Sequence, residues 1–310
     1  MTTTVTKTSY RATETQIFCK TTLAVFLLCA CAASSPAQTA SNQQEPPAAT
    51  PYIYWTNNNN GSIGRSTTGA TGTNESFIAS TNGGTVGGAG LTVNGTYIYW
   101  TSANGGSATT IARANLDGSD VKKNFITGAH NPCGVAVNSE HIYWAGDVGS
   151  TIGRANLNGT GVDQSFISTG AGVCGVALTK SDIYWANYET GDIGRANLDG
   201  SDVNTDFIDA GAGSGIAIEG DYIYFTTSSG TGIGRANLDG SDVNPNFITG
   251  LKGQIAFLAA NSNYIFWADW GSRGSGTTIG RAKLNGTNVI QNYVKGTKGG
   301  FGIAVTGGNP

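Results

Sequence analysis

The stretch IGRANLDGSDVN occupies residues 193–204, and the same twelve letters recur at residues 233–244. Four looser copies begin at Ile63, Ile111, Ile152 and Ile279. An arginine, an asparagine and two aspartates packed this closely could form a catalytic or metal-binding cluster. A motif that occurs six times along one chain is more typical of a structural repeat.

Each copy sits in a longer repeat. An aromatic run with strand character precedes it, at residues 52–55, 97–100, 141–144, 182–185, 222–225 and 264–267. An aromatic-aliphatic pair follows it, at residues 77–78, 125–126, 166–167, 207–208, 247–248 and 293–294. The aromatic runs recur every 40 to 45 residues. The Asp-Gly turns are strong hairpin signals, because glycine adopts the positive φ that such turns require. Four short antiparallel strands at this period predict an all-β propeller blade.

The two ends of the repeat region predict how the ring closes. The first repeat begins at Tyr52, already on its second strand, and the chain ends with an unpartnered innermost strand at residues 302–305. Together these segments restore one complete blade. A ring closed in this way leaves few exposed sheet edges. We therefore predict a six-bladed propeller over residues 51–310, with the C-terminal strand innermost in the first blade.

The repeats resemble a known family. Tyr-Trp-Thr at residues 54–56 and 99–101, the Leu-Asp-Gly turns and the Gly-(Val/Ile)-Ala-Val strands are similar to the YWTD repeats of the low-density lipoprotein receptor family, over residues 52–305. The aspartate that closes the family motif occurs here only as Asp269, and the Cys-rich modules that flank it in the receptors are absent. The resemblance implies an extracytoplasmic six-bladed propeller that binds other molecules, without identifying the ligand.

The N-terminus reads as an export signal over residues 1–37. Basic residues precede an apolar run at residues 23–33 that is too short to span a bilayer. Two processing routes fit the sequence. Leu-Cys-Ala-Cys resembles a bacterial lipobox and would place a lipid on Cys31, whereas Ser-Pro-Ala suits cleavage before Gln38.

Residues 38–50 would then form a short flexible tether. We expect the mature protein to lie outside the cytoplasm, either secreted, periplasmic or lipid-anchored at the cell surface. Contact with a membrane is expected only through that anchor.

The composition excludes one class of partner. Charged residues make up 12% of the chain, the formal net charge is −3 and no basic patch is evident. Nucleic-acid-binding proteins normally carry such a patch. We therefore expect no nucleic-acid partner.

The repeated polar residues are best explained by architecture. Six symmetric arginines, Arg195 among them, cannot all line one asymmetric site, so each is expected to stack on aromatic rings or bind a carboxylate or carbonyl. The paired aspartates of the turns lack the spacing of a calcium loop, and turn chemistry explains them better.

An enzyme with a site in the central channel, such as a lactonase-like hydrolase, is the alternative function. The predicted innermost strands contain no Glu, Asp or His, and His130 and His141 are the only histidines. A hydrolytic site needs convergent titratable groups. We therefore predict no catalytic residue, metal or cofactor.

Cys133 and Cys174 occupy equivalent positions in adjacent repeats. Export favours a disulfide between them. Rotational symmetry argues against it, because equivalent side chains point the same way around the ring, and we expect their Cα atoms near or beyond the usual limit of about 7 Å. Both alternatives stay open.

Binding should depend on loops that differ between repeats. The predicted ligand-binding residues are Tyr188, Glu189, Asp269, Trp270, Arg273 and His130, all in loops expected on one face. Trp, Arg and Tyr are frequent anchors of interfaces. We predict a monomer that binds a protein, peptide or glycan there. A structural surface protein is a further alternative.

Overall fold

The computed structural model describes residues 50–79, 87–103, 109–272 and 274–307. The chain divides into Met1–Ala48 and Ala49–Pro310, and every described residue belongs to the second unit. The signal peptide and Cys31 therefore lie outside the described residues, as does Arg273. The described residues form strands and turns only, and no helix among them could cross a membrane.

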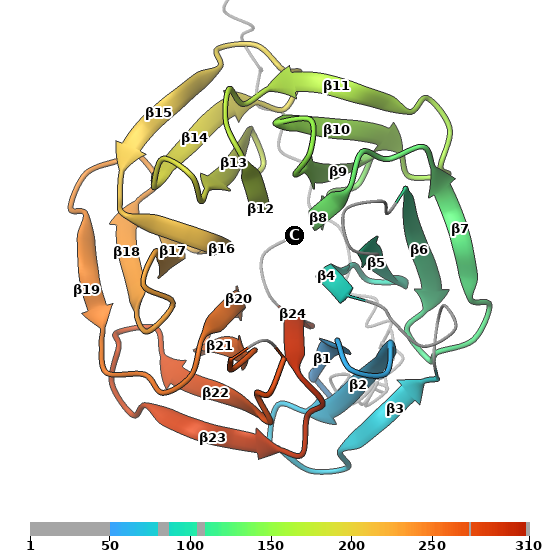
Figure 1. Cartoon of the computed structure of the whole chain (residues 1–310), viewed down its shortest axis with the longest axis vertical. Helices are drawn as coiled ribbons and strands as arrows, with labels where there is room; N and C mark the ends of the chain where they lie inside the picture. The colour runs from blue at the N-terminus through green and yellow to red at the C-terminus, as the bar shows by residue number, and fades with distance from the viewer. Residues whose placement is uncertain (1–49, 80–86, 104–108, 273, 308–310) are drawn as a thin grey trace, which may run out of the picture. The chain divides into compact units, whose positions relative to one another are not determined.

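Six four-stranded antiparallel sheets form the blades and surround a central channel, as predicted (Figure 1). From the channel outwards, blade 1 contains β24 (Gly300–Val305), β1 (Tyr52–Asn57), β2 (Ser62–Thr67) and β3 (Asn74–Ile78). Blade 2 contains β4 (Gly87–Val93), β5 (Tyr97–Ala103), β6 (Thr110–Asn115) and β7 (Lys122–Thr127). Blade 3 contains β8 (Pro132–Val137), β9 (His141–Gly146), β10 (Thr151–Asn156) and β11 (Asp163–Ser168).

The remaining blades follow the same order. Blade 4 contains β12 (Val173–Leu178), β13 (Asp182–Asn187), β14 (Asp192–Asn197) and β15 (Asn204–Asp209). Blade 5 contains β16 (Ala212–Glu219), β17 (Tyr222–Thr227), β18 (Ile233–Asn237) and β19 (Asn244–Ile248). Blade 6 contains β20 (Ile255–Ala260), β21 (Tyr264–Asp269), β22 (Thr278–Lys283) and β23 (Ile290–Lys295).

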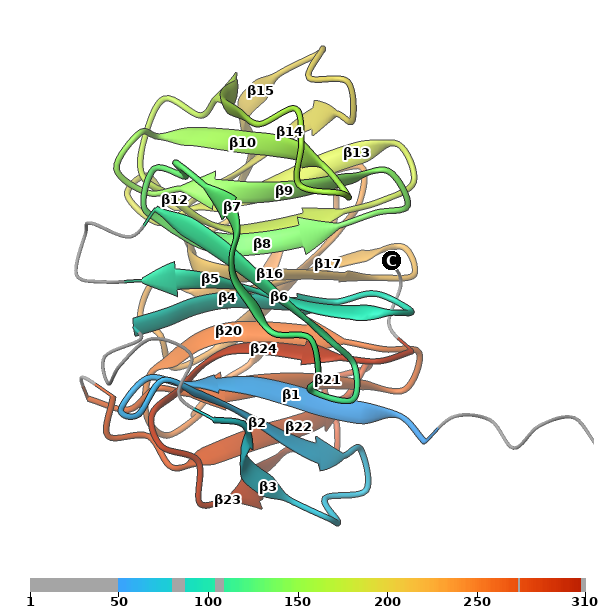
Figure 2. The ribbon, with the colours of Figure 1, turned by 90° about the vertical axis from the view of Figure 1, so that its right-hand side faces the viewer.

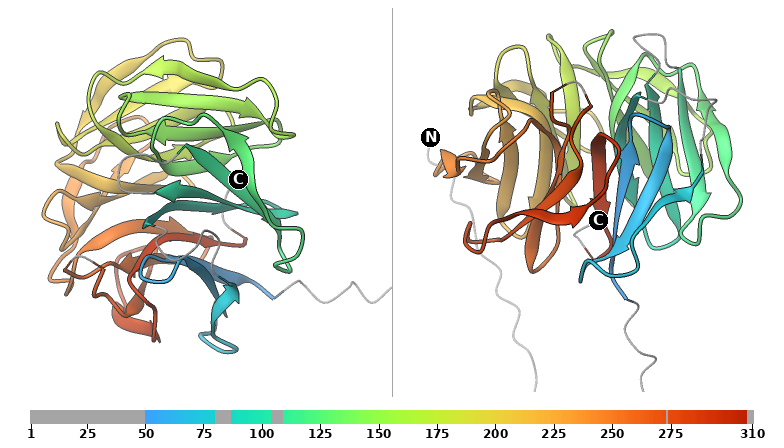
Figure 3. Two further views of the ribbon diagram at one scale, coloured as in Figure 1. Left: turned by 45° about the vertical axis from the view of Figure 1, so that its right-hand side comes forward. Right: turned by 60° about the horizontal axis from the view of Figure 1, so that its bottom comes forward.

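The C-terminal strand closes the ring. β24 pairs with β1 in a register that sets Tyr54 opposite Ala304 and Trp55 opposite Ile303, and the two strands lie side by side in Figure 3. The Tyr52 amide donates to the Thr306 hydroxyl at 2.7 Å. The predicted closure is therefore confirmed.

The repeated motif forms the third strand of each blade and the turn into the fourth. Its glycine makes room for the tryptophan of the second strand: a Cβ on Gly194 would lie 2.1 Å from the Trp185 ring. Its aspartate shapes the turn, since Asp199 accepts hydrogen bonds from the Ser201 amide at 2.9 Å and hydroxyl at 2.6 Å. Gly200 has φ 86°, which favours glycine. The turn interpretation of the Asp-Gly pairs is confirmed.

The motif also joins neighbouring blades. The buried Tyr184 of blade 4 donates its hydroxyl to the Leu238 carbonyl of blade 5 at 3.0 Å, and Tyr143 reaches Leu198 in the same way at 3.2 Å. Six apolar clusters fill the spaces between blades, one for each interface. The tyrosine of one repeat and the leucine carbonyl of the turn in the next repeat thus form a hydrogen bond that joins neighbouring blades.

All six arginines lie over aromatic rings, as predicted, and in blade 4 the arginine also binds a carboxylate. Arg113 lies 4.0 Å from the Tyr97 ring centre and 4.2 Å from that of Phe125. Blade 4 has Asp182 in place of the first aromatic residue, and Arg195 donates to its carboxylate at 2.8 and 3.0 Å. Stacking and carboxylate binding, the two expected roles, therefore both occur.

Cys133 and Cys174 are joined by a disulfide between β8 and β12, with their Cα atoms 4.9 Å apart. The expected separation near 7 Å is wrong. The innermost strands converge on the axis, and Gly134 lets their backbones approach, since a Cβ there would lie 2.3 Å from the Cys174 carbonyl oxygen.

Candidate functional site

The loops before each blade and those between its second and third strands share one face, which we call the loop face. The turns between first and second strands and between third and fourth strands form the opposite turn face. Figure 2 shows the ring from the side, with β1 beginning at the turn face on the right. Contacts join loops of both kinds on the loop face: Asn131 donates to Asp147 at 3.1 Å, and the Trp270 amide donates to the Gln254 carbonyl at 2.8 Å.

Blades 3 and 4 carry a polar cluster on this face. The Tyr188 hydroxyl donates to the Asp147 carboxylate at 2.5 Å across the gap between the two blades. Burial and the adjacent Asp147 carboxylate raise the pKa of Tyr188, so the phenol stays protonated and keeps donating at neutral pH. The opposite oxygen of Asp147 accepts the Asn131 amide. The loops are therefore held in place before any ligand arrives.

Glu189 adds a second carboxylate beside this pair. It accepts a hydrogen bond from the Gly172 amide at 3.0 Å. A Cβ at Gly172 would lie 2.7 Å from the Glu189 carboxyl group and 2.8 Å from the Tyr188 hydroxyl. The absence of a side chain at residue 172 thus allows Tyr188 and Glu189 to share one small area.

The same area exposes apolar surface. Val148, next to Asp147, is 69% exposed, the largest value among the described large hydrophobic residues, and Tyr188 is 40% exposed. His130 is also exposed, and its Nδ1 atom lies 3.6 Å from where a Cβ on Gly149 would be. We call His130, Asp147, Val148, Tyr188 and Glu189 the blade 3–4 patch.

The other predicted residues lie on blade 6. Trp270 is half-buried and meets Phe301 edge-on, with ring centres 5.5 Å apart. Its indole nitrogen is buried and has no hydrogen-bond partner within the described part of the chain. One side of the Trp270 ring therefore packs against Phe301, and part of the side chain stays accessible on the loop face.

Asp269 is half-buried and accepts the Gly271 amide at 2.8 Å. Burial raises its pKa, and hydrogen bonds from the backbone of Gly271 and Gln254 oppose that shift. The structure thus places Tyr188 and Glu189 side by side and sets His130 beside Gly149, in the loop whose Asp147 binds Tyr188. Asp269 and Trp270 lie apart from them on blade 6.

Charge is unevenly distributed over the loop face. Glu189 and Asp209 are exposed on blade 4, whereas Lys252, Lys295 and Lys298 are exposed on the connections at either side of blade 6. The blade 3–4 patch therefore lies in the acidic half of the face. Such asymmetry steers charged partners towards one orientation.

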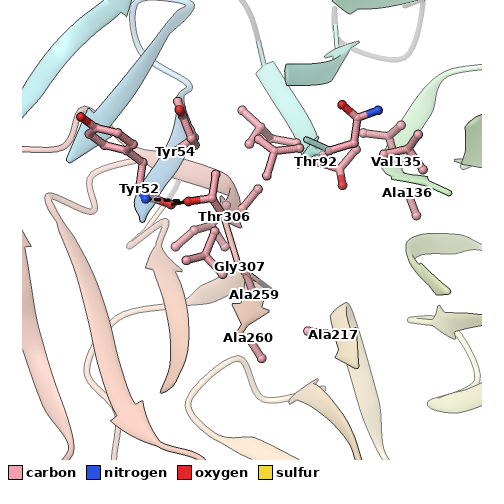
Figure 4. Close-up of a pocket in the computed structure, with 18 of the residues that line it drawn as sticks. Tyr52, Tyr54, Thr92, Val135, Ala136, Ala217, Ala259, Ala260, Thr306 and Gly307 are labelled. Carbon is pink, nitrogen blue, oxygen red and sulfur yellow. Dashed lines mark hydrogen bonds between the residues drawn. The ribbon is translucent and has the colours of Figure 1, made fainter. Parts of the chain in front are cut away.

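The central channel contains a cavity of about 820 Å³. Its wall is formed by the innermost strands of all six blades, and small apolar side chains from several of them surround it in Figure 4. The charged residues that line it, Arg65 and Asp117, belong to β2 and to the turn after β6 rather than to the innermost strands. Over the described ranges there is no group of three or more His, Cys, Asp or Glu side chains that could hold a metal ion.

No family model matches the sequence, and no curated protein matches it. Among solved structures, a chain of the crystal structure of a nidogen–laminin complex is similar with a TM-score of 0.64 and 15% identity, covering 82% of this chain and 98% of that one. A likeness at this identity shows the fold alone. A virginiamycin B lyase from Staphylococcus aureus has a TM-score of 0.49 and 19% identity, covering 66% of this chain and 69% of the lyase, which carries no inference about activity.

Proposed function

We propose that this propeller binds a protein partner outside the cytoplasm through the blade 3–4 patch. The observation that carries the proposal is the Tyr188–Asp147 hydrogen bond, which fixes two loops of different blades beside the exposed Val148. Loops that are ordered before binding lose less conformational entropy when a partner docks. The proposal that the partner is a protein rests on the similarity to the nidogen–laminin complex. The choice of contact residues rests on the structure of this chain alone.

Two features support the location. The N-terminal sequence reads as an export signal, and the Cys133–Cys174 disulfide is of a kind that persists in oxidising compartments. The acidic carboxylates of the patch favour a partner that presents basic groups around an apolar side chain.

The test compares two similar substitutions on opposite faces. Val148→Asp places a charge in the patch, and Val203→Asp places the same charge on the turn face, where Val203 is 44% exposed. The mature protein is used to capture partners from its own source, and the affinity of each captured protein is then measured for both variants and for Tyr188→Ala.

We expect Val148→Asp and Tyr188→Ala to weaken binding by about tenfold or more, the size of an interface hot spot. Val203→Asp should bind like the original protein, and all three variants should keep their melting temperature. The proposal would be contradicted if Val148→Asp bound the partner as tightly as the original protein, or if Val203→Asp lost as much affinity as Val148→Asp.

A further inference from the structure

The innermost strands line the channel with three layers of side chains. The layer nearest the loop face lies opposite the second-strand tryptophans or Phe225 and consists of Leu91, Val135, Val176, Ile216, Leu258 and Ile303. The middle layer consists of Thr92, Ala136, Ala177, Ala217, Ala259 and Ala304. The layer nearest the turn face consists of Val93, Val137, Leu178, Ile218, Ala260 and Val305.

The cavity opens on the turn face. Its lining there includes Thr50, Asn94, Gly95 and Gly307, which lie at the ends of the innermost strands or beside the start of β1. None of the residues of the blade 3–4 patch lines it. This opening is therefore on the opposite side of the ring from the proposed protein-binding surface.

Towards the loop face the ring is tightly packed. A Cβ on Gly90 would lie 2.6 Å from the Cys133 carbonyl oxygen, so neighbouring innermost strands touch there. The Cys133–Cys174 disulfide joins two of these strands, and the Phe257 and Phe301 rings lie 5.5 Å apart beside them. Trp270 packs on Phe301 from the loop side. The cavity lining extends no further in this direction than the level of Gly90 and Phe257.

The three layers of side chains in the channel wall disfavour a charged ligand. None of the three layers contains a charged side chain, and Thr92 is their one polar member. A charged group at these layers would lose its water of hydration without gaining a charged partner, at a large cost in free energy. The two charged residues of the cavity lining, Arg65 and Asp117, lie outside the layers, on β2 and in the turn after β6. Each innermost strand pairs on one side only, so backbone N–H and C=O groups on its other edge face the axis. The wall thus combines apolar side chains with neutral hydrogen-bonding groups.

Thr92 also breaks the symmetry of the ring. Five repeats have alanine at this position, and blade 2 alone has a hydroxyl. One hydroxyl in a ring of methyl groups gives an otherwise regular cavity a single preferred orientation for a ligand. Binding pockets for small molecules have this composition, largely apolar with few polar groups, and volumes of about 300–1,000 Å³.

We propose that the channel binds an uncharged, mainly apolar small molecule that enters from the turn face and forms a hydrogen bond with Thr92. The small side chains of the middle layer leave the channel wide enough for the ligand. The packed rings of Phe257, Phe301 and Trp270 towards the loop face stop the ligand from passing through. This site is independent of the proposed protein-binding surface.

Two fluorescent probes with nearly the same aromatic skeleton test the proposal. N-phenyl-1-naphthylamine is neutral, whereas 1-anilinonaphthalene-8-sulfonate carries a sulfonate. We expect saturable binding of one neutral probe per chain and at least about tenfold weaker binding of the anion. Absence of saturable binding by the neutral probe, or equal binding of both probes, would overturn the proposal.

Variants then locate the site. Ala217→Leu narrows the middle layer and should weaken binding of the neutral probe about tenfold or more, whereas Val148→Asp on the loop face should leave it unchanged. Thr92→Ala supplies the residue of the other five repeats, so it should fold normally and weaken binding severalfold. Unchanged binding in Thr92→Ala together with unchanged binding in Ala217→Leu would show that the probe binds elsewhere and would overturn the proposal.

Discussion

At the residue scale, blade 4 shows what happens when one repeat loses an aromatic residue. Asp182 takes the place of the ring that covers the arginine in blades 1, 2, 5 and 6, and Arg195 turns to its carboxylate. The guanidinium lies 5.3 Å from the Phe207 ring centre, further than the 4.2 Å between Arg113 and Phe125. In blade 4 an ion pair between Arg195 and Asp182 thus replaces part of the arginine–aromatic stacking, while the strands keep the arrangement of the other blades.

This replacement predicts a dependence of stability on pH. Burial raises the pKa of Asp182, but hydrogen bonds from Ser181 and Arg195 outweigh it and hold that pKa below its usual value. A carboxyl group with a lowered pKa in the folded state stabilises the protein above its unfolded pKa, about 3.9, and loses this contribution as pH falls through the folded pKa.

Asp182→Asn should therefore lower the free energy of unfolding at pH 7 by about 1 kcal/mol or less, because the Arg195 side chain is 38% exposed and water screens the pair. Urea unfolding from pH 7 to pH 3 should show the difference from the original protein shrinking below about pH 4. Asp209→Asn, on the exposed end of β15, is the control and should unfold like the original. A difference that stays constant with pH would contradict this account of Asp182.

At the element scale, β24 is the strand on which the ring depends. It supplies the innermost strand of blade 1 and buries Ile303 and Val305. Burial of two such side chains contributes about 3–6 kcal/mol, and loss of the strand would also expose the edge of β1.

A chain that ends after Gly299 should therefore be unfolded or aggregated, whereas one that ends after Gly307 should melt like the full chain. Circular dichroism and thermal melting distinguish these results. If the chain without β24 keeps a cooperative unfolding transition near the original melting temperature, ring closure by β24 is not required for stability, and this account is contradicted.

Most elements could be predicted because each blade repeats the same local signals. Six aromatic runs and six third strands predicted the blades, and the incomplete repeats at Tyr52 and Val305 predicted the closure. Contacts between loops of different blades could not be predicted in the same way. The Tyr188–Asp147 hydrogen bond joins residues 41 positions apart, and no local sequence pattern predicts it.

Two features depend on tertiary packing that the repeats do not specify. The Cα separation of Cys133 and Cys174 depends on how tightly the innermost strands converge, which the repeat period does not specify. The position of Trp270 depends on Phe301, which belongs to the closing strand of another blade. Thr92 could have been found from sequence, since an alignment of the repeats sets it against five alanines.

At the scale of the whole molecule, repeated residues build the ring and unrepeated residues distinguish its two sides. Copies of the motif at residues 193–204 supply turns, contacts with the second-strand tryptophan or Phe225, and contacts between blades around the ring. The blade 3–4 patch and Thr92 occur once each, the patch on the loop face and Thr92 in the lining of the channel cavity. We infer that the loop face engages a macromolecule and that the channel accepts a small one.

Hydrogen–deuterium exchange of the mature chain with and without its captured protein partner tests the central claim most directly. The account predicts that added protection is confined to the loops of the blade 3–4 patch, at residues 129–131, 146–150 and 187–191. Protection of the turn-face segments around Asp117, Asp199 and Asp239, with those loops unchanged, would contradict it.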